Sequence, residues 1–211
     1  MPCTTSLGAY TVKNISIHRG VFMHPQLLTE RFTLRPLREA DAAAMAQACQ
    51  DPDIIRFCLS VPLNYTEETA RDFVAYTHQA SESGHELVWG IDASGVFAGV
   101  VSLFNVTDSS AEVGYWLAPG SRGQGFLTEA LGMVVGFALD PQGLGLDQLS
   151  WKALADNGAS ERVARRVGFT NFRTLVKSQP GRPLEDGSTP LLDMRAAELT
   201  RDRWAELGFP G

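Results

Sequence analysis

The chain has 211 residues, of which 44% are hydrophobic and 20% charged, a composition typical of one globular domain with a full core. Its formal net charge is −6 and its lysines and arginines are scattered, so nucleic acid is not expected as a main partner. The cysteines Cys3, Cys49 and Cys58 are odd in number and lack paired spacing, which argues against a disulfide framework and a metal site.

The N-terminal segment, residues 1–26, shows no sustained hydrophobic period. We expect an extension there that adds an edge strand or is partly disordered. It has no basic region followed by an apolar run, and no stretch of the chain is long enough to span a bilayer. The sequence therefore predicts a cytoplasmic protein without a membrane partner, whose single domain covers residues 27–211.

The first elements of that domain are a strand and two helices. Residues 28–37 alternate apolar and polar side chains and predict the strand. Residues 39–50 are rich in alanine and predict a helix, and Thr66 can cap a second helix that ends near Gly84. Residues 53–62, between the two helices, are short and apolar.

A β-hairpin comes next. Residues 87–92 and 96–105 are apolar runs joined by Asp-Ala-Ser-Gly, a turn signal. Residues 111–117, rich in β-branched and aromatic side chains, predict a third strand that completes an antiparallel meander. Because side chains alternate along a strand, Glu112 would share a face with Trp116.

A glycine-rich loop follows the strand at 111–117. Pro119 ends the pairing, residues 120–125 include three glycines, and apolar residues recur at helical spacing from Phe126. Unpaired N–H groups at the start of a helix, together with the charge of Arg122, make a seat for a phosphate or pyrophosphate. A plain flexible turn is the alternative. The loop lacks the ending of a P-loop and the glycine spacing of a dinucleotide fingerprint.

The rest of the chain again alternates strands and helices. Residues 148–153 predict a strand and residues 159–167 a helix. Residues 170–178 and 191–197 predict the last two strands, with a loop at 179–190 that is rich in proline and glycine. This order predicts a mixed α/β fold with about seven strands, mostly antiparallel, and helices on both faces of the sheet.

Two motifs in this frame resemble those of a known family. Residues 122–130, RGQGFLTEA, resemble the acetyl-coenzyme A loop of the GNAT N-acetyltransferases in its RimJ/RimL form. Residues 157–169 resemble the same subgroup's N-x-x-S-x-x-V-x-x-x-x-G-F, and matching blocks extend from Leu28 to Trp204. Leu127 departs from the loop pattern, which has a small residue there. The resemblance implies the GNAT fold, acetyl-CoA as co-substrate and no metal.

The resemblance also implies roles for individual residues. The strands at 111–117 and 148–153 would splay apart, with the pantetheine arm in the gap. In the family the asparagine of the second motif holds the pantetheine and the serine protonates the departing thiolate, which points to Asn157 and Ser160. Alternatively, Ser160 is an ordinary residue on the surface of the helix, without a catalytic role. The residues expected to bind the coenzyme are Leu117, Ala118, Arg122, Gly123, Gln124, Gly125, Phe126, Leu127, Thr128 and Asn157.

The transfer reaction needs a neutral amine. At pH 7, deprotonation costs about 1 kcal/mol for an N-terminal amine and about 4.6 kcal/mol for a lysine, so only a lysine demands a strong base. Glu112 is the candidate base, acting directly or through a water, and a structural ion pair is the alternative. His78 and His85 are reserve candidates. Backbone N–H groups near Ala118 would polarise the thioester carbonyl.

The sequence leaves the acceptor open between a protein N-terminus and a small-molecule amine such as an antibiotic or polyamine. Residues 57–65 and 179–190 are expected to shape its site, with Trp89 as a further candidate. Cys49 and Cys58 lie in apolar settings and carry no nucleophile signature, which favours direct attack by the amine. A non-catalytic acyl-CoA sensor is the alternative from another class. A homodimer is compatible with the sequence.

Overall fold

The computed structural model describes residues 11–13 and 24–208, whose strands form a single sheet. The strands are β1 (Thr11–Lys13), β2 (Gln26–Leu28), β3 (Thr33–Pro36), β4 (Leu87–Ala93), β5 (Val96–Phe104), β6 (Ser110–Leu117), β7 (Gln148–Leu154), β8 (Thr170–Pro180) and β9 (Leu191–Thr200). The helices are α1 (Ala42–Ala48), α2 (Pro52–Phe57), α3 (Glu67–Glu82), α4 (Phe126–Leu139), α5 (Gly158–Val167) and α6 (Arg201–Glu206), with short 3₁₀ turns at Glu39–Asp41 and Pro119–Ser121.

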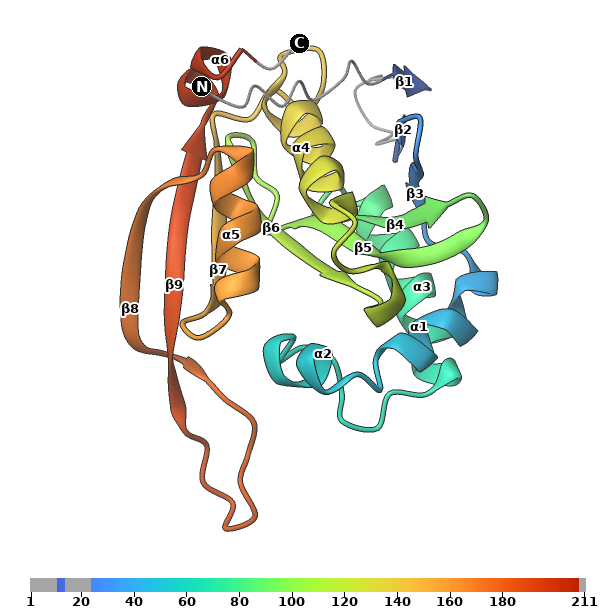
Figure 1. Ribbon diagram of the computed structural model, residues 1–211, viewed down its shortest axis with the longest axis vertical. Coiled ribbons are helices and arrows are strands. Elements are labelled where there is room, and N and C mark those ends of the chain that lie inside the picture. The colour runs from blue at the N-terminus through green and yellow to red at the C-terminus, as the bar shows by residue number, and fades with distance from the viewer. Residues whose placement is uncertain (1–10, 14–23, 209–211) are drawn as a thin grey trace.

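The sheet is antiparallel throughout except at its centre. Its strand order is β1-β2-β3-β4-β5-β6-β7-β9-β8, and only β6 and β7 run parallel (Figure 1). A parallel pair needs a crossover, which α4 supplies between the two strands. The predicted mixed α/β fold is confirmed. The described residues form nine strands, two more than predicted, because the short strands β1 and β2 extend the sheet edge beyond β3.

The two faces of the sheet carry separate hydrophobic clusters. One cluster packs α4 and α5 against the sheet and includes Leu131 and Trp151. The other packs α1 and α3 on the opposite face and includes Met45 and Val74. Helices therefore cover both faces, as predicted, and the strands β4 and β5 contribute alternate residues to the two clusters.

The parallel strands separate halfway along their length. Pairing runs from Ser110 opposite Gln148 to Val113 opposite Trp151, and then stops although both strands continue. The last residues of β7 still pair with β9, so β6 loses its neighbour on one side. The expected splay is confirmed, and it opens a gap at the carboxyl ends of two parallel strands, where α/β proteins bind ligands.

On the side of β6 away from the gap, close contact with β5 fixes the position of β6. Gly99 has a φ of 154°, next to a register shift between β4 and β5. A Cβ at this position would overlap the Trp116 carbonyl oxygen and lie 2.9 Å from Leu117 Cα. Glycine is therefore required for β5 to approach the end of β6.

The predicted strand at residues 28–37 is wrong in its first half. A turn separates β2 from β3 there, and the Thr29 hydroxyl accepts 3.0 Å hydrogen bonds from the N–H groups of Arg31 and Phe32. Such local bonds compete with strand pairing, and alternation of side chains does not reveal them.

Other expected bounds shift slightly. α2 occupies part of the apolar segment 53–62, for which no element was expected, and α6 follows the last strand. β8 continues to Pro180, which shortens the predicted loop at 179–190. Of the predicted extension 1–26, β1 forms an edge strand, while residues 1–10 and 14–23 lie outside the described part of the chain. The boundary after residue 26 stays a prediction.

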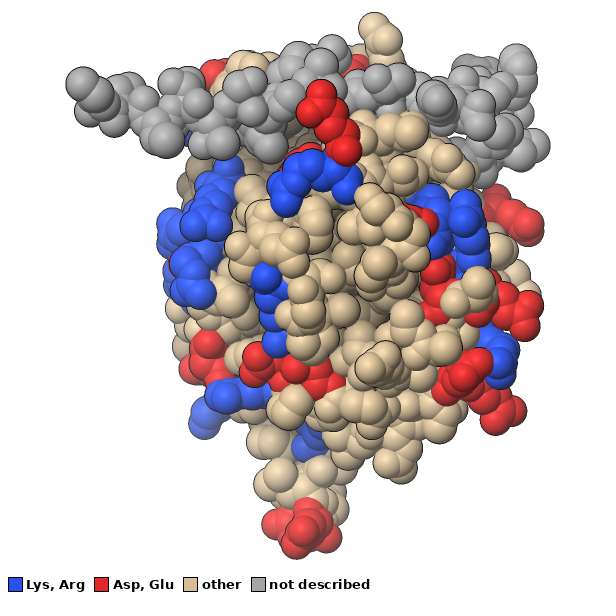
Figure 2. All heavy atoms as spheres, turned by 45° about the vertical axis from the view of Figure 1, so that its right-hand side comes forward, with Lys and Arg blue, Asp and Glu red and all other residues tan. Residues whose placement is uncertain are grey.

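One face of the molecule carries charges of both signs (Figure 2). On the described part of the face seen in Figure 2, lysines and arginines lie beside aspartates and glutamates, around a broad uncharged area. Within residues 11–13 and 24–208, none of the helices has the length and hydropathy needed to cross a membrane.

Replacing Gly99 tests the strand contact. We expect Gly99→Ala to lower the free energy of unfolding by about 1–3 kcal/mol, because the added Cβ meets backbone that cannot move aside cheaply. Gly120→Ala is the control, since nothing lies within 4 Å of a Cβ there. Urea unfolding monitored by tryptophan fluorescence gives both values, and equal midpoints for the two variants would contradict the close approach.

Candidate active site

Two cavities meet where β6 and β7 separate. One has a volume of about 330 Å³ and lies between the end of β6, the loop before α4, and α5. The other, of about 1030 Å³, lies on the opposite side of β6, under α2 and α3. The residues that line both cavities are Phe57, Cys58, Tyr115, Trp116, Asn157 and Ser160. A reaction between two substrates, one in each cavity, would take place at this junction.

Most of the predicted coenzyme residues surround the smaller cavity. Those that line it are Leu117, Arg122, Gly123, Gly125, Leu127, Thr128 and Asn157. Three do not: Ala118 packs against the α1–α3 cluster, Gln124 Nε2 donates to Gly120 O, and Phe126 lies edge-on to Phe32. Arg166 of α5 also lines the cavity, a position that the sequence did not single out.

The start of α4 is suited to an anion. Its N-cap is Gly125, with a φ of 80°, and no side chain caps the first turn. A Cβ at Gly123 would meet nothing within 4 Å, so the backbone there is open to a ligand. The uncapped N–H groups and the helix dipole together favour a phosphate. These features fit the pyrophosphate of a coenzyme.

Arg31, in the turn between β2 and β3, holds this loop in place. Its guanidinium donates to Gln124 O at 2.7 Å, pairs with Glu129 at 2.9 Å, and lies 4.6 Å from the centre of the Phe126 ring. The sequence separation of more than 90 residues explains why no local pattern indicated this contact.

Arg122 contacts two carboxylates of α2 rather than standing alone. Its guanidinium pairs with Asp51 at 2.5 Å and with Asp53 at 3.2 Å. Partial burial raises the pKa of Asp51, but the hydrogen bonds from Arg122 and from the N–H of Ile54 outweigh it and hold that pKa below its ordinary value. Asp51 is therefore ionised at neutral pH, and the two aspartates together hold Arg122 beside the cavity.

A hydrogen-bonded group of three side chains lies at the junction. Ser160 Oγ donates to Tyr115 Oη at 3.1 Å and accepts from Trp151 Nε1 at 3.2 Å, and Tyr115 Oη donates to Ser160 O at 3.0 Å. Asn157 caps α5 by accepting from Ser160 N at 3.1 Å. Burial raises the pKa of Tyr115 to about 12, so its phenol stays protonated. Neither Tyr115 nor Trp151 was expected here, because their contacts with Ser160 come from three different elements.

The backbone of β6 places its groups on alternate sides. The N–H of Ala118 donates to Ala98 O at 2.9 Å on the β5 side, so it is not available to a thioester. Because neighbouring residues of a strand point their N–H groups in opposite directions, those of Tyr115 and Leu117 face the gap left by β7. The oxyanion donor expected near Ala118 is therefore better placed one residue earlier, at Leu117.

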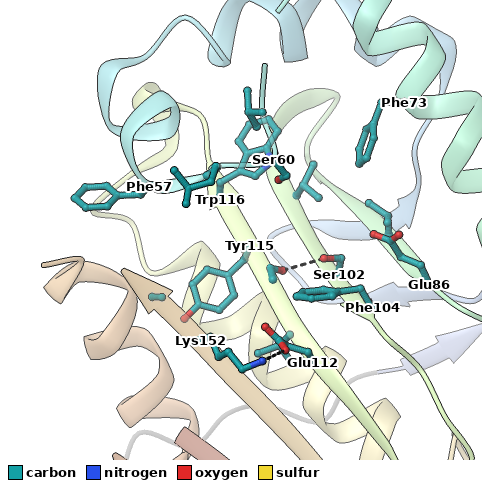
Figure 3. Close-up of a pocket in the computed structure, with 18 of the residues that line it drawn as sticks. Phe57, Ser60, Phe73, Glu86, Ser102, Phe104, Glu112, Tyr115, Trp116 and Lys152 are labelled. Carbon is teal, nitrogen blue, oxygen red and sulfur yellow. Dashed lines mark hydrogen bonds and ion pairs between the residues drawn. The ribbon is translucent and has the colours of Figure 1, made fainter. Parts of the chain in front are cut away.

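Glu112 lies in the wall of the larger cavity (Figure 3). Its carboxylate accepts a 2.8 Å bond from Lys152 Nζ of β7, and its side chain is 14% exposed. The position of the Glu112 carboxylate in the cavity wall suits a general base. Its ion pair with Lys152 matches the alternative, in which Glu112 has only a structural role. Of the reserve bases, His85 also lines this cavity, whereas His78 Nε2 bonds Leu37 O and does not.

Several residues around the larger cavity follow the expectation for the acceptor site. From segment 57–65 these are Phe57, Cys58, Leu59, Ser60, Val61, Pro62 and Tyr65, but from 179–190 only Gln179 takes part. The expectation for Trp89 is wrong. Its side chain is fully buried on the α4 face, and its Nε1 donates to Pro25 O. Alternation along β4 instead turns Val88 towards the cavity.

Arg182 fixes the segment 55–61, which covers the larger cavity. Its Nη2 donates to three carbonyl oxygens, those of Ile55 at 2.9 Å, Cys58 at 3.2 Å and Val61 at 2.7 Å. The loop after β8 is thereby tied to the turn that follows α2. Nothing in the local sequence indicated this contact across more than 120 residues.

The two described cysteines are poor nucleophiles. Burial raises the pKa of Cys49 to about 12 and that of Cys58 to about 11, the latter despite the nearby charges of Arg122 and Arg182. Among the described residues, His, Cys, Asp and Glu form no group of three that could hold a metal ion.

Comparison with known proteins agrees with this geometry. A family model described as an acetyltransferase (GNAT) domain matches residues 31–170. An uncharacterized N-acetyltransferase, p20 of Bacillus licheniformis, is 26% identical over 183 residues, covering 85% of this chain and 98% of that protein.

Solved structures of acetyltransferases share the fold. One, from Salmonella typhimurium, modifies the N-terminal serine of ribosomal protein L7/L12. It has a TM-score of 0.69 and 20% identity, over 82% of this chain and 96% of that one. The microcin C7 self-immunity acetyltransferase MccE, in complex with acetyl-CoA and AMP, has a TM-score of 0.67 and 20% identity, over 82% and 93% of the two chains.

The reactivity of Cys58 tests the environment of the junction. A pKa of about 11 in place of the ordinary 9.0 leaves roughly 100-fold less thiolate at pH 8, so we expect roughly 100-fold slower alkylation by iodoacetamide in the folded protein than in urea. The rate should rise about tenfold per pH unit between pH 7 and 9. Peptide mass mapping separates Cys58 from the other cysteines, and equal rates with and without urea would contradict the burial.

Proposed function

The chain belongs to the GNAT acetyltransferase family, and we propose that it transfers the acetyl group of acetyl-coenzyme A directly to a primary amine. The observation that carries this proposal is the junction itself, where an anion-binding loop and a second, larger cavity share Tyr115, Trp116 and Ser160. A non-catalytic acyl-CoA sensor would not need the second cavity.

Residues of the smaller cavity hold the coenzyme in this proposal. The N–H groups of residues 123–128 bind the pyrophosphate, and Arg122 turns from Asp51 and Asp53 towards it. Leu117 N–H, which faces the gap between β6 and β7, donates to the thioester carbonyl oxygen and stabilises the charge that develops there. Asn157 caps α5 and thereby fixes the position of Ser160 beside the gap.

Proton transfers at the junction complete the reaction. Acetyl-coenzyme A supplies an electrophilic carbonyl carbon and a thiol leaving group. Glu112 accepts the proton that the amine nitrogen loses as its bond to the carbonyl carbon forms, directly or through a water. Ser160 Oγ gives its proton to the sulfur as the carbon–sulfur bond breaks, and solvent water then returns a proton to Ser160 Oγ. Tyr115 and Trp151, which bond to Ser160 Oγ, hold it in position for this step.

The acceptor is a primary amine in the larger cavity. The two structurally similar enzymes act in different settings, one on the N-terminal serine of a ribosomal protein and one in self-immunity to microcin C7. The RimJ/RimL resemblance supports the first kind of acceptor, and the negative net charge suits either kind of cationic amine.

The cellular setting completes the proposal. A cytoplasmic location is supported by the free cysteines Cys49 and Cys58 and by the use of acetyl-CoA. Mixed surface charge supports a role without nucleic acid or membrane partners. A homodimer stays a prediction from the sequence.

Removing the charge of Arg122 tests the coenzyme seat. We expect Arg122→Gln to weaken coenzyme A binding by about 10- to 100-fold, since a hydrogen bond to a charged group contributes about 1.5–3 kcal/mol. Arg203→Gln on α6 makes the same change in net charge away from the cavity and should bind as the parent does. Titration calorimetry measures both, and an unchanged dissociation constant for Arg122→Gln would refute the assignment.

Glu112 and its partner Lys152 can be tested as a pair. If Glu112 is the base, Glu112→Gln lowers kcat by about 10²–10⁴-fold below the pKa of the acceptor amine and by less above it. Lys152→Met removes the same ion pair but keeps the carboxylate, so its loss should be much smaller. Steady-state kinetics across pH 6–10 decide. Equal losses in the two variants, with profiles parallel to the parent, would mean that Glu112 acts only through the ion pair.

A further inference from the structure

A second carboxylate lies opposite Glu112 in the larger cavity. Glu112 of β6 is directly opposite Phe104 of β5, and Leu103 is opposite Leu87 of β4, which places Glu86 beside Phe104 on the same row. Figure 3 shows Glu86, Phe104 and Glu112 facing one space. Two strand spacings put the Cα atoms of the two glutamates roughly 10 Å apart.

The side chains around this space leave Glu86 without a cation. Three carboxylates line the cavity, those of Asp72, Glu86 and Glu112, against one ammonium, Lys152, which pairs with Glu112. The formal charges of these four side chains sum to −2. Among the described residues, no lysine, arginine or histidine lies in an ion pair with Glu86, whereas Asp92 of β4 and Glu112 of β6 each have such a partner.

Glu86 is nevertheless held in place. Tyr76 of α3 donates its hydroxyl to Glu86 Oε2 at 2.8 Å, and this hydrogen bond and the charge of Glu86 raise the pKa of Tyr76. Phe73 stacks on Tyr76 with ring centres 6.2 Å apart, and the Phe104 ring closes the space from the sheet side. Ring faces attract ammonium and guanidinium groups, so a fixed carboxylate beside aromatic rings suits a cation.

We propose that Glu86 is a specificity-determining residue that binds a second cationic group of the acceptor. The acceptor class is then an amine with another positive charge, held about two strand spacings from the reacting nitrogen at Glu112. A diamine, or an N-terminal amine followed by a basic side chain, has this chemistry. The inference rests on the proposed function, since it takes the larger cavity as the place where the acceptor reacts.

Matched acceptors test the preference. Acetyl transfer from acetyl-CoA is measured for 1,5-diaminopentane against pentylamine, and for Ser-Arg-amide against Ser-citrulline-amide, whose side chains differ in charge and little in shape. In the parent protein we expect kcat/KM to favour the charged member of at least one pair by about tenfold or more, through KM, as a charged hydrogen bond would give. The pair that shows the preference distinguishes a small diamine from a peptide.

Three variants locate the preference. Glu86→Gln should reduce it to within about threefold while the uncharged acceptors react as before, because the substitution removes only the charge. Tyr76→Phe keeps the carboxylate but releases it, and should give an intermediate preference. Glu82→Gln, at the exposed end of α3, changes the net charge equally and should keep the parent's preference.

The outcomes separate this inference from the proposed function. Acetylation of charged and uncharged acceptors at equal kcat/KM, or a preference that survives Glu86→Gln, would overturn the role of Glu86 and leave the N-acetyltransferase assignment standing. Coenzyme binding without acetylation of any acceptor would overturn both.

Discussion

The early end of pairing between β6 and β7 is the constraint on which the active site depends. After Val113 and Trp151 the backbone of β6 has no strand on one side, although it continues to Leu117. An unpaired N–H group in a partly buried position is costly unless something accepts its hydrogen bond. A thioester carbonyl would supply that acceptor, so the defect in the sheet becomes the place where a coenzyme is held.

Each of the two strands that separate is followed by a helix that completes the site. Because both run in the same direction, α4 and α5 begin at the same end of the gap and point their positive N-terminal ends towards it. Because side chains alternate along a strand, neighbouring residues of β6 face different substrates. Tyr115 and Leu117 serve the coenzyme side together with Ser160, while Glu112 and Trp116 face the acceptor.

Local sequence patterns predicted the helices and strands. Contacts between residues that are distant in sequence determined the final arrangement of the site. Strand alternation and helix capping give the order from β4 to α5, the cap at Thr66 and the loop before α4. The same patterns do not say which face of a strand is covered, and so Trp89 was placed on the wrong side. A hydroxyl turn at Thr29 likewise interrupts a stretch whose alternation suggests one strand. The braces at Arg31 and Arg182, and the contacts of Arg122 with Asp51, join segments that no short window contains together.

A structure of the protein with acetyl-CoA bound tests the central claim most directly. The account predicts the thioester between β6 and β7, its carbonyl oxygen about 3 Å from the N–H of Leu117, and the pyrophosphate against residues 123–128. A thioester bound outside that gap, or a pyrophosphate held away from the start of α4, would contradict it.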